Sequence, residues 1–143
     1  MQELIVSLML WVQAYLGSPV LPTTPTVNLL NPIAWEESLT SEGGGADIVA
    51  FYNILTLGVY LKDTWSLSDP YDRGVLVHEL VHVFQHQVPQ RIYKCHALRE
   101  NEAYIAQSAY LVSQGVDPHA DSERRAVSRW ILLLTSACST DDW

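Results

Sequence analysis

The sequence predicts a single α+β domain, because of its length and the order of its expected elements. Its 143 residues are the size of one domain and leave little room for a second. Hydrophobic residues make up 48 % of the chain and charged residues 17 %, which is enough apolar material for a packed core. One helix comes first, short strands follow, and three helices complete the chain without any internal repeat. This order predicts one α+β domain over residues 1–143.

The charge of the chain limits its partners. The formal net charge is −8, from 16 acidic and 8 basic residues, which argues against nucleic acid or an anionic membrane as a main partner. No apolar run approaches the roughly 18 residues that a membrane-spanning helix needs. The sequence therefore predicts no nucleic-acid partner and no membrane span, and it leaves the oligomeric state open.

The first 17 residues, MQELIVSLMLWVQAYLG, predict a helix packed on the core. A signal peptide begins with basic residues, and here the first basic residue is Lys62. The polar or small residues Glu3, Ser7 and Ala14 share one narrow stripe at helical spacing among apolar neighbours. We therefore favour a packed first helix over an uncleaved signal peptide, while a removed leader peptide stays open.

The next part of the chain predicts strands. Residues 26–30, TVNLL, are typical of a short strand, and residues 31–45 are expected to be irregular or to hold one weak helical turn. Residues 46–52 and 54–61 are rich in β-branched and aromatic side chains, and Asn53 lies between them. These two segments predict a hairpin or two successive strands.

Three helices are expected in the second half. Asp69–Pro70 supplies an N-cap and a proline at the first helical position for a helix over about 70–87. A second helix over about 96–114 ends at Gly115, a good residue for the end of a helix. A third begins within 117–121 and continues through RRAVSRWILLLTS.

The two cysteines allow two interpretations. Cys95 and Cys138 lie 43 positions apart and show no C-x-x-C spacing, so a thiolate zinc site is not expected. One disulfide between them is favoured over two free buried thiols, because so small a domain offers the pair no other role. A disulfide would imply an oxidising compartment, which favours a secreted or periplasmic protein, and free thiols would favour the cytoplasm.

The segment HELVH, residues 78–82, has the spacing of a zinc site. On a helix His78 and His82 lie one turn apart, so both imidazoles can reach one ion. Glu79 lies about 100° round from His78, which suits a group that holds a water at the ion rather than a ligand. His86 lies about 12 Å along the axis from His78 and cannot join the same ion. The alternative is a helix with solvated histidines.

Two glutamates in RENEAYIAQSAYL compete for the place of the third ligand. In helical projection, the residues within about 40° of Glu102 are Leu98, Ala106 and Ala109. Glu100 points about 160° away from Glu102 and is expected to be a solvated acid of the first turn. A carboxylate centred on an apolar face must be paired or bound to metal, so Glu102 is the predicted ligand.

HELVH followed by a glutamate twenty positions after its second histidine resembles the gluzincin group of zinc metallopeptidases. The likeness is closest to the short, single-domain minigluzincin zincins, and it covers roughly residues 46–114. It implies a zincin-like fold, in which a small sheet packs against an active-site helix, with a glutamate-bearing helix and a C-terminal helix. It also implies His78, His82 and Glu102 as zinc ligands. Glu79 would be the general base, and the strand before the motif helix would pair with an extended substrate.

Two features depart from that family pattern. Many gluzincins place an aspartate four residues after the ligand glutamate to hold a ligand histidine, and here that position is Ala106. A backbone carbonyl or Asn101 would then have to hold the histidine. The residue that stabilises the oxyanion stays open among four candidates, Tyr52, Tyr110, His96 and His119.

The sequence thus predicts a zinc-dependent metallopeptidase that hydrolyses the peptide bonds of a peptide or protein substrate. In this reaction a glutamate activates the water at the metal. Two alternatives stay open: a non-catalytic, zinc-containing zincin-fold binding module, and a zinc hydrolase that acts on a non-peptide amide. The sequence gives no specificity pocket and no particular substrate.

Overall fold

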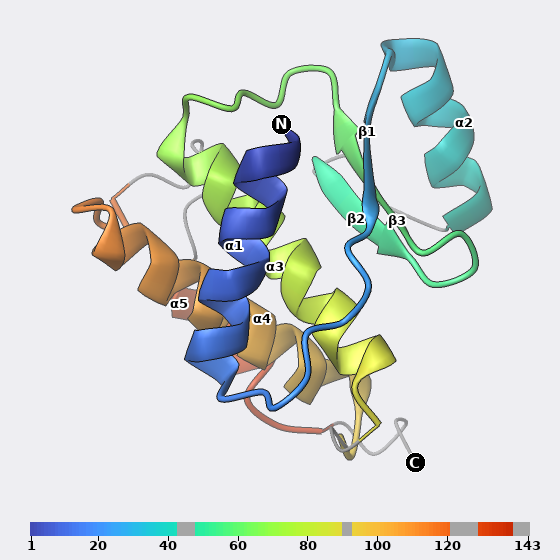
Figure 1. The fold of residues 1–143 in the computed structure, drawn as a ribbon. Coiled ribbons are helices and arrows are strands. Elements are labelled where there is room, and N and C mark those ends of the chain that lie inside the picture. Colours follow the sequence, from blue (N-terminus) through green and yellow to red (C-terminus); the bar gives the residue numbers. More distant parts are fainter. Residues whose placement is uncertain (43–47, 90–92, 121–128, 139–143) are drawn as a thin grey trace.

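A three-stranded sheet and five helices make up the fold in the parts of the chain that the computed structural model describes, residues 1–42, 48–89, 93–120 and 129–138 (Figure 1). The predicted α+β class is confirmed. Among the helices in these ranges, none is both long enough and apolar enough to cross a bilayer.

The sheet has the order β1-β3-β2, formed by β1 (Thr26–Leu30), β2 (Ala50–Asn53) and β3 (Gly58–Lys62). The central strand β3 runs parallel to β1 and antiparallel to β2. The predicted hairpin is thus present, and its turn is built by the Asn53 side chain, whose Oδ1 accepts hydrogen bonds from the backbone nitrogens of Leu55 and Thr56 at 2.8 and 3.1 Å. Strand β2 forms one edge of this sheet.

Helix α2 (Pro32–Glu42) covers one face of the sheet, on the side away from α1 and α3 (Figure 1). The expectation of an irregular segment or a single weak turn over 31–45 was wrong for residues 32–42. The Asn31 side chain accepts a hydrogen bond from the Ala34 backbone nitrogen at 2.9 Å, which begins the helix. Trp35 is buried and its ring lies 5.7 Å from that of Phe51, so a tertiary contact stabilises a segment of weak helical pattern.

The core lies on the other face of the sheet. Helix α1 (Gln2–Leu16), predicted as a packed helix, buries a stripe at helical spacing that consists of Ile5, Leu8, Met9 and Val12. Helix α3 (Pro70–Gln87) lies between α1, α4 and β2 and is buried along most of its length. Its predicted N-cap is confirmed, because the Asp69 side chain accepts a hydrogen bond from the Tyr71 backbone nitrogen at 2.9 Å.

Helix α4 (His96–Ser113) packs along α3 at close range. Gly74 makes this possible, since a Cβ atom added there would lie 3.2 Å from the Leu111 side chain. Ala103 and Ala106 of α4 are fully buried, and their small side chains allow the same approach. The two helices that carry the candidate site residues are therefore held close together by residues without bulky side chains.

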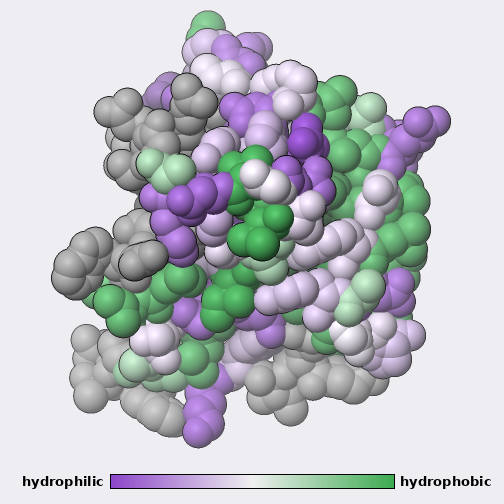
Figure 2. All heavy atoms as spheres, turned by 90° about the vertical axis from the view of Figure 1, so that its left-hand side faces the viewer, coloured by the Kyte–Doolittle hydropathy of each residue, from purple (hydrophilic) through white to green (hydrophobic). Residues whose placement is uncertain are grey.

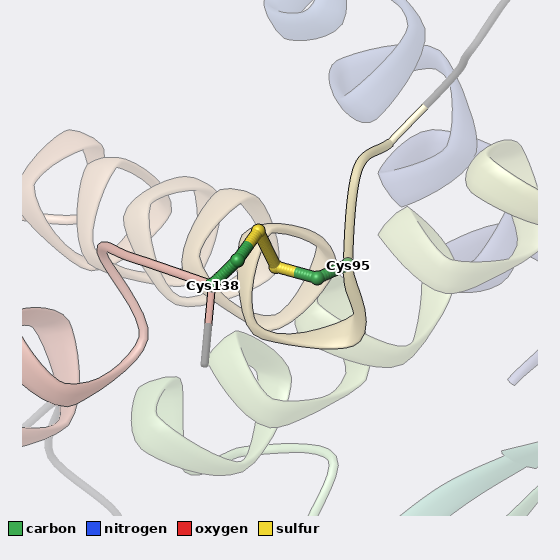
Figure 3. The surroundings of a disulfide bond; sticks show 2 residues. All are labelled: Cys95 and Cys138. Atoms are coloured by element: carbon green, nitrogen blue, oxygen red, sulfur yellow. A yellow bond between two sulfur atoms is a disulfide. The ribbon is translucent and has the colours of Figure 1, made fainter. Parts of the chain in front are cut away.

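The C-terminal part is joined to the start of α4. Helix α5 covers Arg129–Leu134. Of the two expected starts of this helix, the one near residues 117–118 was wrong, because residues 117–120 are not helical, and the one at residue 121 lies outside the described residues. The predicted disulfide between Cys95 and Cys138 is present (Figure 3), and Asn101 Nδ2 donates to the Leu132 carbonyl at 3.0 Å. Figure 2 shows the side of the molecule on the left of Figure 1, where polar and apolar residues are mixed in the middle of the view and apolar residues gather along its right-hand side.

We predict that removing the disulfide with the double substitution Cys95→Ser/Cys138→Ser lowers the free energy of unfolding by about 3–4 kcal/mol, because the bond closes a loop of 43 residues in the unfolded chain. Urea denaturation followed by circular dichroism measures the change. Wild-type protein in reductant should approach the stability of the double variant. Two alkylated thiols in the intact mass of the non-reduced protein would contradict the bond itself.

Candidate metal centre

Helix α3 presents the two histidines of HELVH side by side. The Nε2 atoms of His78 and His82 lie 3.1 Å apart, and the two rings meet edge to face with their centroids 4.8 Å apart. His78 is buried and His82 is half-buried. Two imidazole nitrogens that face each other at this distance cannot both present a lone pair unless a proton or a metal ion lies between them.

The carboxylate of Glu100 completes the cluster from α4. Its Oε2 lies 3.3 Å from His78 Nε2, and its Oε1 lies 3.2 Å from His82 Nε2. A tetrahedral zinc ion with bonds of about 2.0–2.1 Å keeps its ligand atoms about 3.3–3.4 Å apart. The three side chains therefore fit one face of such a coordination shell, and they could hold a metal ion.

The predicted third ligand, Glu102, does not join the two histidines, and Glu100 takes its place. The reason is the rotation of α4. The face centred on Glu102 is not the buried one, since Ile105 beside it is 44 % exposed. Taking Ala103 as the reference direction, Glu100 lies about 60° to one side and Glu102 about 100° to the other. The stripe that is buried consists of Ala103, Ala106, Gln107, Tyr110 and Leu111.

The electrostatics of the cluster favour a cation. Burial would raise the pKa of Glu100, but hydrogen bonds from His78 and His82 outweigh it and hold the pKa well below its usual value. Burial would lower the pKa of His82, but its hydrogen bond to Glu100 and the charges of Glu79 and Glu100 raise that pKa to about 9. Without an ion, the His82 ring is therefore a positively charged imidazolium at neutral pH. A metal ion would displace its second proton.

A cavity of about 480 Å³ opens beside the cluster, between β2, α3 and α4. Glu79 is buried and lines this cavity together with the three potential ligands. Its place beside the cluster, and not in it, agrees with the direction expected from HELVH. Edge strand β2 contributes Ala50, Phe51 and Tyr52 to the same wall.

Tyr104 is a residue of this cavity that the sequence interpretation missed. Its ring centroid lies 4.4 Å from that of His78, in an edge-to-face arrangement. Burial, followed by the charges of Glu100 and Glu79, raises the pKa of Tyr104, so its hydroxyl stays protonated and can donate a hydrogen bond. Tyr104 lies four residues after Glu100, which is where many gluzincins place an aspartate. The sequence interpretation could not use this spacing, because it counted from Glu102 and not from Glu100.

The four candidates for oxyanion stabilisation divide into two pairs. Tyr52 and His96 line the cavity, and Tyr110 and His119 are not among its lining residues. The Tyr52 hydroxyl lies 3.1 Å from Nδ1 of His86. His86 is not part of the cluster of His78, His82 and Glu100, in agreement with its distance from His78 along the helix.

The partners behind the histidines also differ from expectation. His82 Nδ1 lies 2.7 Å from Oε1 of Gln85, a residue that the sequence interpretation did not single out. Asn101 does not hold either histidine, because its amide contacts Leu132 and Thr135. His78 Nδ1 is buried and has no hydrogen-bond partner among the described residues.

Comparison with known proteins gives a family without an assigned activity. The whole chain, residues 1–143, matches the family model described as "Domain of unknown function (DUF6647)". No curated protein and no solved structure matches the chain. Because the match includes HELVH, Glu100 and both cysteines, the described cluster and the disulfide lie within the family's own domain. The chain belongs to the DUF6647 family.

Proposed function

We propose that this protein is a zinc-dependent metallopeptidase in which His78, His82 and Glu100 bind the metal and Glu79 is the general base. One observation carries the proposal: two imidazole nitrogens and one carboxylate converge at 3.1–3.3 Å beside a cavity that Glu79 also lines. Structural zinc sites are closed by four protein ligands, whereas catalytic sites use three and keep one position open. Two histidines and one glutamate form a catalytic set of this kind.

The arrangement of elements supports a short zincin-like fold as part of the same proposal. A small sheet packs on the helix that carries HELVH, and the next helix supplies the glutamate. The ligand glutamate then follows His82 by eighteen positions rather than the twenty expected for Glu102.

The proposed metal ion, Glu79 and Tyr104 would each have a separate role in the reaction. A bound zinc ion would polarise the carbonyl of the substrate and lower the pKa of a water molecule towards about 7. Glu79, which is not among the ligands, would accept the proton and pass it to the leaving amine. The Tyr104 hydroxyl, kept protonated, would donate a hydrogen bond to the oxygen that becomes negative.

The substrate we propose is an extended peptide that lies along β2. This strand is an edge of the described sheet, and it lines the cavity through Ala50, Phe51 and Tyr52. An extended chain can pair with such an edge through main-chain hydrogen bonds, which recognise a peptide without requiring one particular side chain. The disulfide favours a secreted or periplasmic location for the enzyme.

We predict that Glu100→Gln lowers zinc affinity by more than about 100-fold, because it removes a charged ligand. Loss of a residue that only supports a ligand costs about 10–100-fold, and loss of a ligand should cost more. Glu102→Gln, the matched control on the same helix, should stay within about 10-fold of wild type. Competition with a chelator measures both, and circular dichroism checks folding. Equal zinc affinity of wild type and Glu100→Gln would exclude Glu100 as a ligand.

We predict that Glu79→Gln keeps zinc and the folded state but slows hydrolysis of an unfolded protein by about 10²–10⁴-fold, the usual contribution of a general base. Glu36→Gln, on the exposed side of α2, should not change the rate. Measuring which members of a broad peptide library the protein cleaves distinguishes this function from its alternatives. Zinc binding without any cleavage would favour the binding module, and cleavage of non-peptide amides alone would favour the other hydrolase.

We predict that Tyr104→Phe reduces kcat by about 10²-fold, the lower range for loss of an oxyanion donor, with KM and zinc content near wild type. The ring that contacts His78 is retained, so the metal site should not change. Steady-state kinetics on a cleaved peptide measure the effect. An unchanged kcat would exclude Tyr104 as the donor.

A further inference from the structure

We infer that Glu102, acting through Gln85, is a positioning residue that fixes His82 in the tautomer able to bind metal. The inference rests on the proposed metal site, and it gives the predicted but displaced glutamate a function of its own. Glu102 lies on the flank of α4 opposite to Glu100, so one helix would supply both a ligand and the support of another ligand.

Four hydrogen bonds connect these residues. His82 Nδ1 lies 2.7 Å from Gln85 Oε1. Gln85 Nε2 donates to the Arg99 carbonyl at 2.9 Å and to Glu102 Oε1 at 3.3 Å. The Tyr93 hydroxyl donates to the same Glu102 oxygen at 2.5 Å.

The surroundings of Gln85 decide which end of its amide faces His82. A glutamine side chain has an acceptor oxygen and a donor nitrogen of similar shape, so both orientations are possible in isolation. Here the nitrogen faces two acceptors, the Arg99 carbonyl and the Glu102 carboxylate. The reverse orientation would place the amide oxygen against both of these oxygens. Glu102 and Arg99 therefore keep the oxygen of Gln85 towards the imidazole.

The orientation of Gln85 in turn decides where the neutral His82 ring carries its hydrogen. An amide oxygen can only accept, so Nδ1 of His82 must carry the hydrogen and donate it. Nε2 then keeps its lone pair, and this is the atom that faces His78 and Glu100. In the other tautomer, a hydrogen on Nε2 would point to the place of the ion and exclude it. Hydrogen bonds of this kind commonly orient metal-binding histidines.

His82 is the histidine for which this support matters. His78 Nδ1 has no hydrogen-bond partner among the described residues, and its ring is held by burial and by Tyr104. The network therefore contacts one potential ligand directly, and His86, whose Nδ1 lies 3.1 Å from the Tyr52 hydroxyl, provides an internal reference within the same spectrum.

Glu102→Ala and Glu102→Gln test the inference as a pair. Glu102→Ala removes the acceptor for the Gln85 amide, whereas Glu102→Gln keeps an acceptor oxygen in its place. We expect Glu102→Ala to lower zinc affinity by about 10–100-fold, the usual effect of a residue behind a ligand, and Glu102→Gln to restore it to within about 10-fold of wild type. Glu36→Ala serves as the unrelated surface control.

A second measurement does not depend on zinc or on activity. The substitution Glu100→Ala first removes the carboxylate that faces Nε2 of His82, so that the hydrogen bond at Nδ1 can be tested alone. In this zinc-free background with ¹⁵N-labelled histidine, under alkaline conditions where the imidazoles are neutral, the ring nitrogen shifts report the tautomer. Glu100→Ala alone and Glu100→Ala/Glu102→Gln should show His82 with its hydrogen on Nδ1. Glu100→Ala/Glu102→Ala should show a mixture of tautomers at His82, with the His86 resonances unchanged.

The outcomes separate this inference from the proposed function. A His82 that carries its hydrogen on Nε2 in the Glu100→Ala background overturns the inference, as does a zinc affinity of Glu102→Ala equal to that of wild type. A wild type that binds no zinc overturns the metal site, while the tautomer measurement still decides the role of Glu102. If Glu102→Ala does not fold, Gln85→Leu removes the same amide from α3 and should produce the same loss of the Nδ1–H tautomer.

Discussion

The close packing of α3 on α4 determines the rest of the structure, because each helix alone carries only part of the candidate site. His78, Glu79 and His82 lie on α3, and Glu100 comes from α4. A Cβ atom at Gly74 would lie only 3.2 Å from the Leu111 side chain. The small buried side chains of Ala103 and Ala106 allow the backbones of α3 and α4 to approach each other closely. Larger side chains at this contact would separate the carboxylate from the two imidazoles, which now lie 3.2–3.3 Å from it.

Three glutamates near the contact between α3 and α4 lie in three different environments. Glu79 is buried and lines the cavity without joining the cluster. Glu100 contacts three imidazoles, and hydrogen bonds from two of them, His78 and His82, keep it ionised. Glu102 lies on the other flank of α4 and accepts hydrogen bonds from Gln85 and Tyr93. Glu79 belongs to α3, whereas Glu100 and Glu102 point apart on α4 because each step along a helix turns a side chain by about 100°.

Much of this structure could be predicted from the sequence, but the rotation of α4 could not. HELVH, the cap at Asp69 and the turn at Asn53 are local patterns, and the structure contains all three elements. The rotation of α4 depends on which face meets α3, and that face includes the polar Gln107 and the tyrosine Tyr110. An interpretation based on apolar residues therefore expected Glu102 to face the histidines, whereas the structure places Glu100 there. Helix α2 was missed for a similar reason, because Trp35 stabilises it through the sheet.

The disulfide attaches the start of α4, the helix that carries the Glu100 carboxylate, to the C-terminal segment. Cys95 is the N-cap residue of α4, and Glu100 lies in the second turn after it. Asn101, the next residue, is held by the Leu132 carbonyl and Thr135 of the C-terminal segment. The first turns of α4 are thus attached to that segment on both sides of Glu100, by a covalent bond before it and by hydrogen bonds after it. Such attachment limits fraying at this end of the helix, which carries the carboxylate that contacts the two histidines.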